Sequence, residues 1–126
     1  VYIDQDYSLI KNELKVYEQA QLFNTPALQE HEIKIRLNRF LFSKNDWDKS
    51  NNDLSGGERM RLMLCCLSMS NMPPDLIVLD EPSNNLDLQN LEILTAALTD
   101  YQGTLIVVSH DEYFLNQIFI ERIIQI

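Results

Sequence analysis

The stretch that decides the fold is Leu76-Ile77-Val78-Leu79-Asp80-Glu81-Pro82. Its continuous apolar run, ended at once by two carboxylates, is typical of a central strand that is buried on both faces of a parallel sheet. Leucines at helical spacing follow at positions 88, 91, 94 and 98, and Gly103 then leads into a second apolar run over 104–108. A strand, a helix and a strand joined by short links form a βαβ unit. We therefore expect an α/β fold with a parallel sheet and right-handed crossovers.

Helical patterns dominate the rest of the chain. We expect helices over 9–22, 58–70 and 111–118, strands at 1–3 and 119–126, and one more helix whose apolar stripe consists of Ile33, Leu37, Phe40 and Leu41. The polar segment 43–53 indicates a loop that is anchored by Trp47. We divide the chain into a strand end at 1–6, a small helical subdomain at 7–53 and an α/β core with parallel strands and flanking helices at 54–126.

The composition excludes several classes of protein. With 126 residues, 45% of them hydrophobic, the chain can bury one core. It has 10 Lys and Arg against 19 Asp and Glu, and the net charge of −9 argues against direct binding of nucleic acid or anionic lipid by this segment. Its apolar runs are far shorter than the ~20 residues that cross a bilayer. The adjacent Cys65 and Cys66 fit neither a disulfide nor a metal pair, which favours a reduced, cytoplasmic location.

Polar residues follow three of the expected strands at their carboxyl ends, where open parallel sheets bind their ligands. They are Gln5, the pair Asp80 and Glu81, and the pair Ser109 and His110. Because consecutive strand residues face opposite ways, Asp80 and Glu81 should do different jobs, one holding a hard cation and the other approaching a water molecule. A turn that merely faces solvent is the alternative for this pair of carboxylates.

Helix capping is the alternative explanation for two of the polar motifs. Ser55 with Glu58, and Ser109 with Glu112, both fit the capping box that starts a helix. Taken alone, each motif is therefore explained without any ligand.

The order of the motifs is more specific than any one of them. The chain carries Gln5, then Leu54-Ser55-Gly56-Gly57-Glu58, then the strand ending in Asp80-Glu81-Pro82, then Ser83-Asn84-Asn85-Leu86-Asp87, then Ser109-His110-Asp111. Over essentially the whole chain, this series resembles the ATP-binding cassette (ABC) ATPases from the Q-loop through the signature motif, Walker B, D-loop and H-switch. The D-loop and the run from Ser109 to Leu115 look most like the ABC-F group, soluble twin-cassette proteins of which many act on the ribosome. Ser83 departs from that group, which usually has threonine there, but the hydroxyl is kept.

The resemblance implies an ATP hydrolase that uses ATP and Mg²⁺. It implies that Asp80 and Gln5 hold the metal, that Glu81 is the general base, and that His110 contacts the γ-phosphate and supports the attacking water, with Gln5 also serving catalysis. It further implies that the signature helix faces the γ-phosphate held by a second cassette, arranged head to tail. At the interface between the two cassettes, the resemblance implies the nucleotide-binding residues Ser55, Gly56, Gly57, Glu58 and Asp87.

The glycines limit what this sequence can do alone. Gly56, Gly57 and Gly103 cannot form the Walker A loop GxxxxGK[ST], which in these ATPases precedes the Q-loop, so the sequence corresponds to a partial P-loop NTPase core. We therefore expect the isolated chain neither to bind MgATP usefully nor to hydrolyse it. Two alternatives to an ABC-F protein remain open: the ATP-binding subunit of an ABC membrane transporter, and a non-catalytic interaction module.

Overall fold

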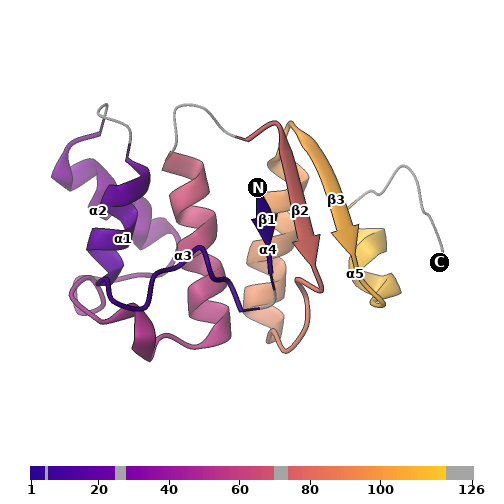
Figure 1. Cartoon of the computed structure of the whole chain (residues 1–126), viewed down its shortest axis with the longest axis horizontal. Helices are drawn as coiled ribbons and strands as arrows, with labels where there is room; N and C mark the ends of the chain where they lie inside the picture. Colours follow the sequence, from indigo (N-terminus) through magenta and orange to yellow (C-terminus); the bar gives the residue numbers. More distant parts are fainter. Residues whose placement is uncertain (5, 25–27, 70–73, 119–126) are drawn as a thin grey trace.

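The computed structural model describes residues 1–4, 6–24, 28–69 and 74–118, and its sheet is parallel. Strands β1 (Tyr2–Ile3), β2 (Leu76–Asp80) and β3 (Thr104–Val108) lie side by side in that order, with β2 in the centre (Figure 1). Val78 pairs with Tyr2 on one side and with Ile106 on the other. The expected α/β fold is confirmed, and the carboxyl ends of the strands point to one edge of the sheet.

The two faces of the sheet differ in burial. Ile77 and Leu79 are 5% and 1% exposed and share a core with Leu94 of helix α4 (Leu88–Asp100). On the other face of β2, Leu76 is 41% exposed and Val78 is half-buried. Their neighbours on β3, Ile106 and Val108, are about half exposed. The expectation that the central strand is buried on both faces is therefore wrong for the described part of the chain, because its helices cover one face of the sheet more completely than the other.

Helix α3 (Gly56–Met69) is the central helix of the structure. It packs against α4 on one side and against α1 (Val16–Phe23) and α2 (Glu30–Arg39) on the other, as Figure 1 shows. A helix that contacts neighbours on several sides must be apolar on most of its surface. Accordingly its buried residues follow one another almost without a break: Met60, Leu62, Met63, Leu64, Cys65, Cys66 and Met69.

The helix expected over 9–22 is shorter than its sequence pattern suggests. Helix α1 begins only at Val16, and the residues before it form turns. The backbone there is bonded by side chains instead of by a helical ladder, since Lys11 donates its N–H to Gln19 Oε1 at 2.9 Å and accepts from Asn51 Nδ2 at 2.9 Å. Gln19 and Asn51 are completely buried, so this polar pairing outweighs the local helical pattern.

The apolar stripe of α2 also ends earlier than expected. Ile33 and Leu37 are buried and Phe40 is half-buried, but Leu41 is 46% exposed and has a left-handed backbone with φ of 69°. Phe42, at 1% exposure, takes the buried place instead. The left-handed turn at Leu41 rotates the chain so that the residue after it, and not Leu41 itself, points into the core.

The last described helix is α5 (Glu112–Gln117), close to the range expected from sequence. The segment 43–53 is mostly turns, as expected, and ends in the short 3₁₀ helix η1 (Asn51–Asp53). The strand expected at 119–126 and the site residue Gln5 lie outside the described residues. Among the described helices, none combines the length and the apolar character that crossing a membrane requires.

Candidate functional site

The strand ends bring Glu81 and His110 together. Glu81 donates its backbone N–H to the carbonyl of Val108 at 2.7 Å, which extends the β2–β3 pairing by one residue. His110 follows Val108 by two residues, and its Nε2 lies 3.6 Å from Glu81 Oε1. The side chain of His110 is 98% exposed and that of Glu81 only 21%. An imidazole in solvent therefore stands beside a largely covered carboxylate.

Glu81 also has an unusual backbone conformation. Its φ is 49°, in the left-handed region that a residue with a side chain rarely adopts. Such a conformation costs on the order of 1–3 kcal/mol and is retained where the surroundings enforce it, often at functional sites. Here the bond to Val108 and the following proline fix the turn, which aims the Glu81 side chain toward His110.

Asp80 has a different partner from Glu81. Its Oδ2 accepts a hydrogen bond from the hydroxyl of Tyr2 at 2.9 Å, and this bond is the main cause of the raised pKa of Tyr2. Tyr2 pairs with Val78, so it shares a face with Asp80 two positions further along β2. Sequence reasoning did not select Tyr2, although the parallel register between the two strands would have placed it there.

The carboxylates have the donor type that Mg²⁺ prefers, but they do not form a complete metal cage. Magnesium keeps several waters and binds through one or two carboxylates together with substrate phosphates. Asp80 offers one half-buried carboxylate, and in the described residues there is no group of three or more His, Cys, Asp or Glu side chains that could hold a metal alone. The site fits Mg²⁺ shared with a phosphate ligand and does not fit zinc, which takes three or four protein ligands.

Asp111 links the turn after β2 to the turn after β3. Its Oδ2 accepts a hydrogen bond from Ser83 Oγ at 3.2 Å, and its Oδ1 accepts one from the N–H of Phe114 at 3.0 Å. Asp111 is therefore the N-cap of α5. The capping interpretation of Ser109 with Glu112 is wrong in detail, because Ser109 Oγ accepts from the N–H of Asp111 and lies before the cap.

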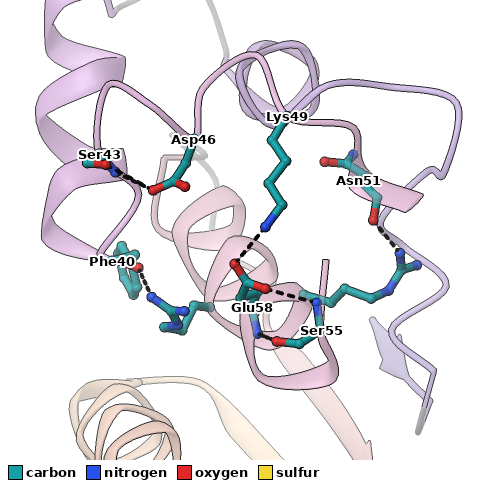
Figure 2. A network of polar contacts seen from close by, with 9 residues as sticks. Phe40, Ser43, Asp46, Lys49, Asn51, Ser55 and Glu58 are labelled. Atoms are coloured by element: carbon teal, nitrogen blue, oxygen red, sulfur yellow. Dashed lines mark hydrogen bonds and ion pairs between the residues drawn. The ribbon is translucent and has the colours of Figure 1, made fainter. Parts of the chain in front are cut away.

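The signature turn, which consists of residues 55–58, forms the capping box that was the alternative explanation for this motif. Ser55 donates its N–H to Glu58 Oε1 at 3.0 Å, and Glu58 donates its own N–H to Ser55 Oγ at 3.2 Å. Figure 2 shows Glu58 also facing Lys49, whose Nζ lies 3.4 Å from Glu58 Oε2. Partial burial opposes ionisation of Glu58, but the bonds from Ser55 and the charge of Lys49 outweigh it and lower the pKa of the Glu58 carboxyl.

The two glycines of this turn have different surroundings. Gly56 is exposed, and a Cβ added there would meet open space. A Cβ on Gly57 would run into the side chain of Asn90 on α4, so a larger residue at this position would have to displace Asn90. The capping box uses the N–H of Glu58. Among the described residues, no acceptor contacts the N–H groups of Gly56 and Gly57, so these two groups can bind an anion.

Asp87 caps helix α4. Its Oδ1 accepts from the N–H of Asn90 at 2.8 Å, and the residue is exposed. Of the residues selected from sequence, the structure thus brings Asp80, Glu81 and His110 to one sheet edge, with Ser83 and Asp111 behind them. Ser55, Gly56, Gly57 and Glu58 form a separate turn at the start of α3.

Comparison with known proteins identifies the family in which these turns occur. The family model described as ABC transporter matches residues 1–84, which include the signature turn and both carboxylates. The chain belongs to the ABC transporter family. The match ends before Asp87 and His110, so these two positions rest on the order of motifs and on their place in the fold.

Curated relatives include proteins of the ABC-F kind. The putative ATP-binding protein YdiF of Bacillus subtilis is 43% identical over 118 residues, which are 93% of this chain and 18% of YdiF. The energy-dependent translational throttle protein EttA of Haemophilus influenzae is 45% identical over 73 residues, 58% of this chain and 13% of EttA. Further relatives are ABC transporter F family members of Arabidopsis thaliana. The chain thus spans less than a fifth of YdiF or of EttA.

Solved cassettes share the fold. MJ0796, a bacterial ABC transporter cassette with a dimeric structure, matches with a TM-score of 0.67 over 91% of this chain and 54% of that chain, at 20% identity. A second dimeric structure of MJ0796 is a post-hydrolysis state bound to ADP and Pi and matches with a TM-score of 0.64 at 21% identity, over 92% of this chain and 55% of that chain. At this identity the likeness shows the fold alone.

Proposed function

We propose that this chain is the distal part of an ATP-hydrolysing cassette, in which Glu81 and His110 act on the water that attacks the γ-phosphate. The observation that supports this most is their meeting at the ends of two neighbouring parallel strands, with His110 Nε2 3.6 Å from Glu81 Oε1. Glu81 is the base that accepts the proton of the water, and its covered position keeps the carboxylate oriented. His110 reaches from solvent toward the phosphate and helps to hold the water.

Asp80 is proposed as the metal-binding carboxylate, together with Gln5. When bound, Mg²⁺ neutralises charge on the phosphate oxygens. The contribution of Asp80 is a carboxylate whose orientation is fixed by the Tyr2 hydroxyl at 2.9 Å. Gln5 lies two residues after the end of β1, the strand that carries Tyr2, and is proposed on the order of motifs alone.

The turn at the start of α3 is proposed to serve the nucleotide of a second cassette. Gly56 and Gly57 offer their N–H groups and the positive end of the α3 dipole to a phosphate, while Ser55 and Glu58 hold the turn in place. Asp87 is proposed at the same interface between the two cassettes. The capping box supports this role because it holds the turn rigid without using the N–H groups of the glycines. The dimeric structures of MJ0796 support a paired arrangement.

We further propose a cytoplasmic role in translation for the whole protein. The support is the similarity to EttA, whose name describes a translational throttle, and to the ABC transporter F family members. Because this segment carries a net charge of −9, the surface that contacts ribosomal RNA belongs to other parts of the protein. Sedimentation of the full-length protein with ribosomes in ATP tests this role, and absence from the ribosome fraction would favour the transporter alternative.

Steady-state ATP hydrolysis by the natural full-length protein that carries this sequence tests the enzymatic proposal. Glu81→Gln should lower kcat by about 100-fold or more, as expected for loss of a general base. Asp80→Asn should raise the Mg²⁺ concentration needed for half-maximal activity. Glu92→Gln is the matched control, since Glu92 is an exposed carboxylate on α4 and is not among the residues assigned to the site. Equal kcat for Glu81→Gln and the wild type would contradict the proposal.

A further inference from the structure

Tyr7 holds the turn that carries Glu81. Its side chain is 6% exposed, and its hydroxyl donates to the carbonyl of Pro82, the residue after Glu81, at 3.3 Å. Its backbone has a left-handed φ of 51°. A tyrosine rarely adopts this conformation, and burial of the ring together with the bond to Pro82 accounts for its retention. The segment after β1 is thereby fastened to the turn after β2.

Arg59 holds the same segment from the other side. It lies in the first turns of α3, two residues after Gly57. A guanidinium has five N–H donors, and here each has an acceptor within the chain. Nε donates to the carbonyl of Asp6 at 3.3 Å; Nη1 donates to Asn12 Oδ1 at 2.7 Å and to the carbonyl of Asn51 at 3.1 Å; Nη2 donates to the carbonyls of Tyr7 at 3.5 Å and Ile10 at 3.0 Å.

These bonds make Arg59 a structural clamp. With all five donors engaged, the side chain has none left for a phosphate. A lysine could not replace it, because an ammonium has three donors and no planar fork. The acceptors are mostly backbone carbonyls in the non-helical segment between β1 and α1, so Arg59 takes the place of the helical ladder that is missing there.

The two sets of contacts meet at Tyr7. The Tyr7 hydroxyl binds the carbonyl of Pro82, and the Tyr7 carbonyl binds Arg59. Two hydrogen bonds, linked through the covalent frame of Tyr7, therefore join the turn that carries Glu81 to the first turns of α3. The two ends of this connection are the two groups that the proposed function assigns to different nucleotides.

We propose that Tyr7 and Arg59 are positioning residues that couple the turn after β2 to the amino end of α3. This inference rests on the proposed function for its meaning, since the coupled groups are the hydrolytic residues of one site and the phosphate-facing turn of the other. A displacement at either end pulls on the segment 6–12 and is passed to the opposite end. Coupling of this kind is established only by comparing single and double variants.

Amide hydrogen exchange in the full-length protein without nucleotide is the direct test. Tyr7→Phe removes one hydroxyl and keeps the ring, and it should accelerate exchange by about threefold or more both at 79–86 and at 55–62. In an Arg59→Lys background, the same substitution should accelerate 79–86 only. Two matched controls should leave 55–62 unchanged. Tyr101→Phe removes the bond of another tyrosine hydroxyl to a proline carbonyl, that of Pro74. Arg36→Lys changes an arginine of α2 that bonds to the carbonyl of Ser68, at the opposite end of α3.

The outcomes separate this inference from the proposed function. If Tyr7→Phe changes exchange at 79–86 alone, or if the effects of the two substitutions at 55–62 simply add, the coupling is refuted. If the wild type hydrolyses no ATP, the proposed function fails while the exchange result still decides the coupling. Where hydrolysis is present, Tyr7→Phe should lower kcat by about threefold to tenfold with KM unchanged, because it disturbs the position of Glu81 and not the affinity for nucleotide. An unchanged kcat would contradict a role in positioning.

Discussion

The Nε2 atom of His110 lies 3.6 Å from a carboxylate oxygen of Glu81, although one side chain is 98% exposed and the other 21%. The backbone brings them together, because Asp80 pairs with Val108 and the N–H of Glu81 then binds the carbonyl of Val108. The contact depends little on packing around the imidazole. His110 is therefore free to reach a ligand beyond the sheet edge.

Substitution of His110 should affect catalysis without affecting stability. His110→Ala removes a solvent-exposed side chain, so the free energy of unfolding should stay within about 0.5 kcal/mol of the wild type. The kcat for ATP in the full-length protein should fall by about 100-fold through loss of support for the attacking water. His31→Ala is the control, since His31 is exposed on α2. A loss of kcat for His31→Ala as large as for His110→Ala would show that the effect is not specific to the site.

The glycines of the signature turn should respond differently to alanine. Gly57→Ala should destabilise the chain by about 1 kcal/mol, because its methyl group must displace the Asn90 side chain. Gly56→Ala meets open space at the start of a helix and should be neutral or stabilise by up to about 1 kcal/mol. Urea unfolding measures both, and Asn90→Ala should rescue Gly57→Ala. Equal destabilisation at the two positions would show that packing on α4 is not what requires Gly57.

Much of this fold could be predicted from the sequence because its signals are local. The apolar runs at 76–79 and 104–108 and the leucine spacing between them identify the βαβ unit, and the order of motifs identifies the family. The strand ends then follow from topology, which is why Asp80, Glu81 and His110 could be selected before the structure was known. The clamp of Arg59 could not, because its acceptors are distant in sequence. The bond from Tyr2 to Asp80 required the register of β1 against β2, which the sequence pattern alone does not give.

Two of the errors arise where local contacts override the helical pattern of the sequence. The helix expected to begin at Leu9 begins at Val16, because buried polar side chains bond the backbone before it. On α2, Phe42 is buried in place of Leu41, because Leu41 has a left-handed backbone. The two-sided burial expected for β2 failed for another reason. An apolar run shows that a strand is suited to burial on both faces, but the other elements present decide which face is covered.

The buried amide pair should be essential for stability. Gln19 and Asn51 are both fully buried, and Gln19 Oε1 accepts from the N–H of Lys11 at 2.9 Å and from Asn51 Nδ2 at 3.4 Å. Gln19→Ala leaves these donors unpaired and should cost about 2–4 kcal/mol in the free energy of unfolding. Gln21→Ala, exposed on the same helix, should change it by less than about 0.5 kcal/mol. Chemical denaturation of the two variants measures the difference, and equal midpoints would contradict the proposed role of the buried pair.

Alkaline unfolding should depend on Tyr7. Burial raises its pKa from 10.0 to about 12, so the folded state keeps the phenol proton after the unfolded state has lost it. The free energy of unfolding is therefore unaffected by this group below pH 10 and falls as the pH rises from 10 toward 12. Tyr7→Phe should show a smaller fall over that range, while other groups that titrate, such as the buried Cys65, contribute to both proteins. Parallel curves would show that Tyr7 ionises normally in the folded state.

The central claim is that Glu81 acts in hydrolysis and not in nucleotide binding. The most direct measurement is a single turnover with limiting ATP, in which the nucleotide retained by the full-length protein is recovered and identified. The wild type should release or retain ADP, whereas Glu81→Gln should retain ATP with its γ-phosphate intact and with unchanged affinity. Recovery of ADP from Glu81→Gln at the wild-type rate would contradict the account.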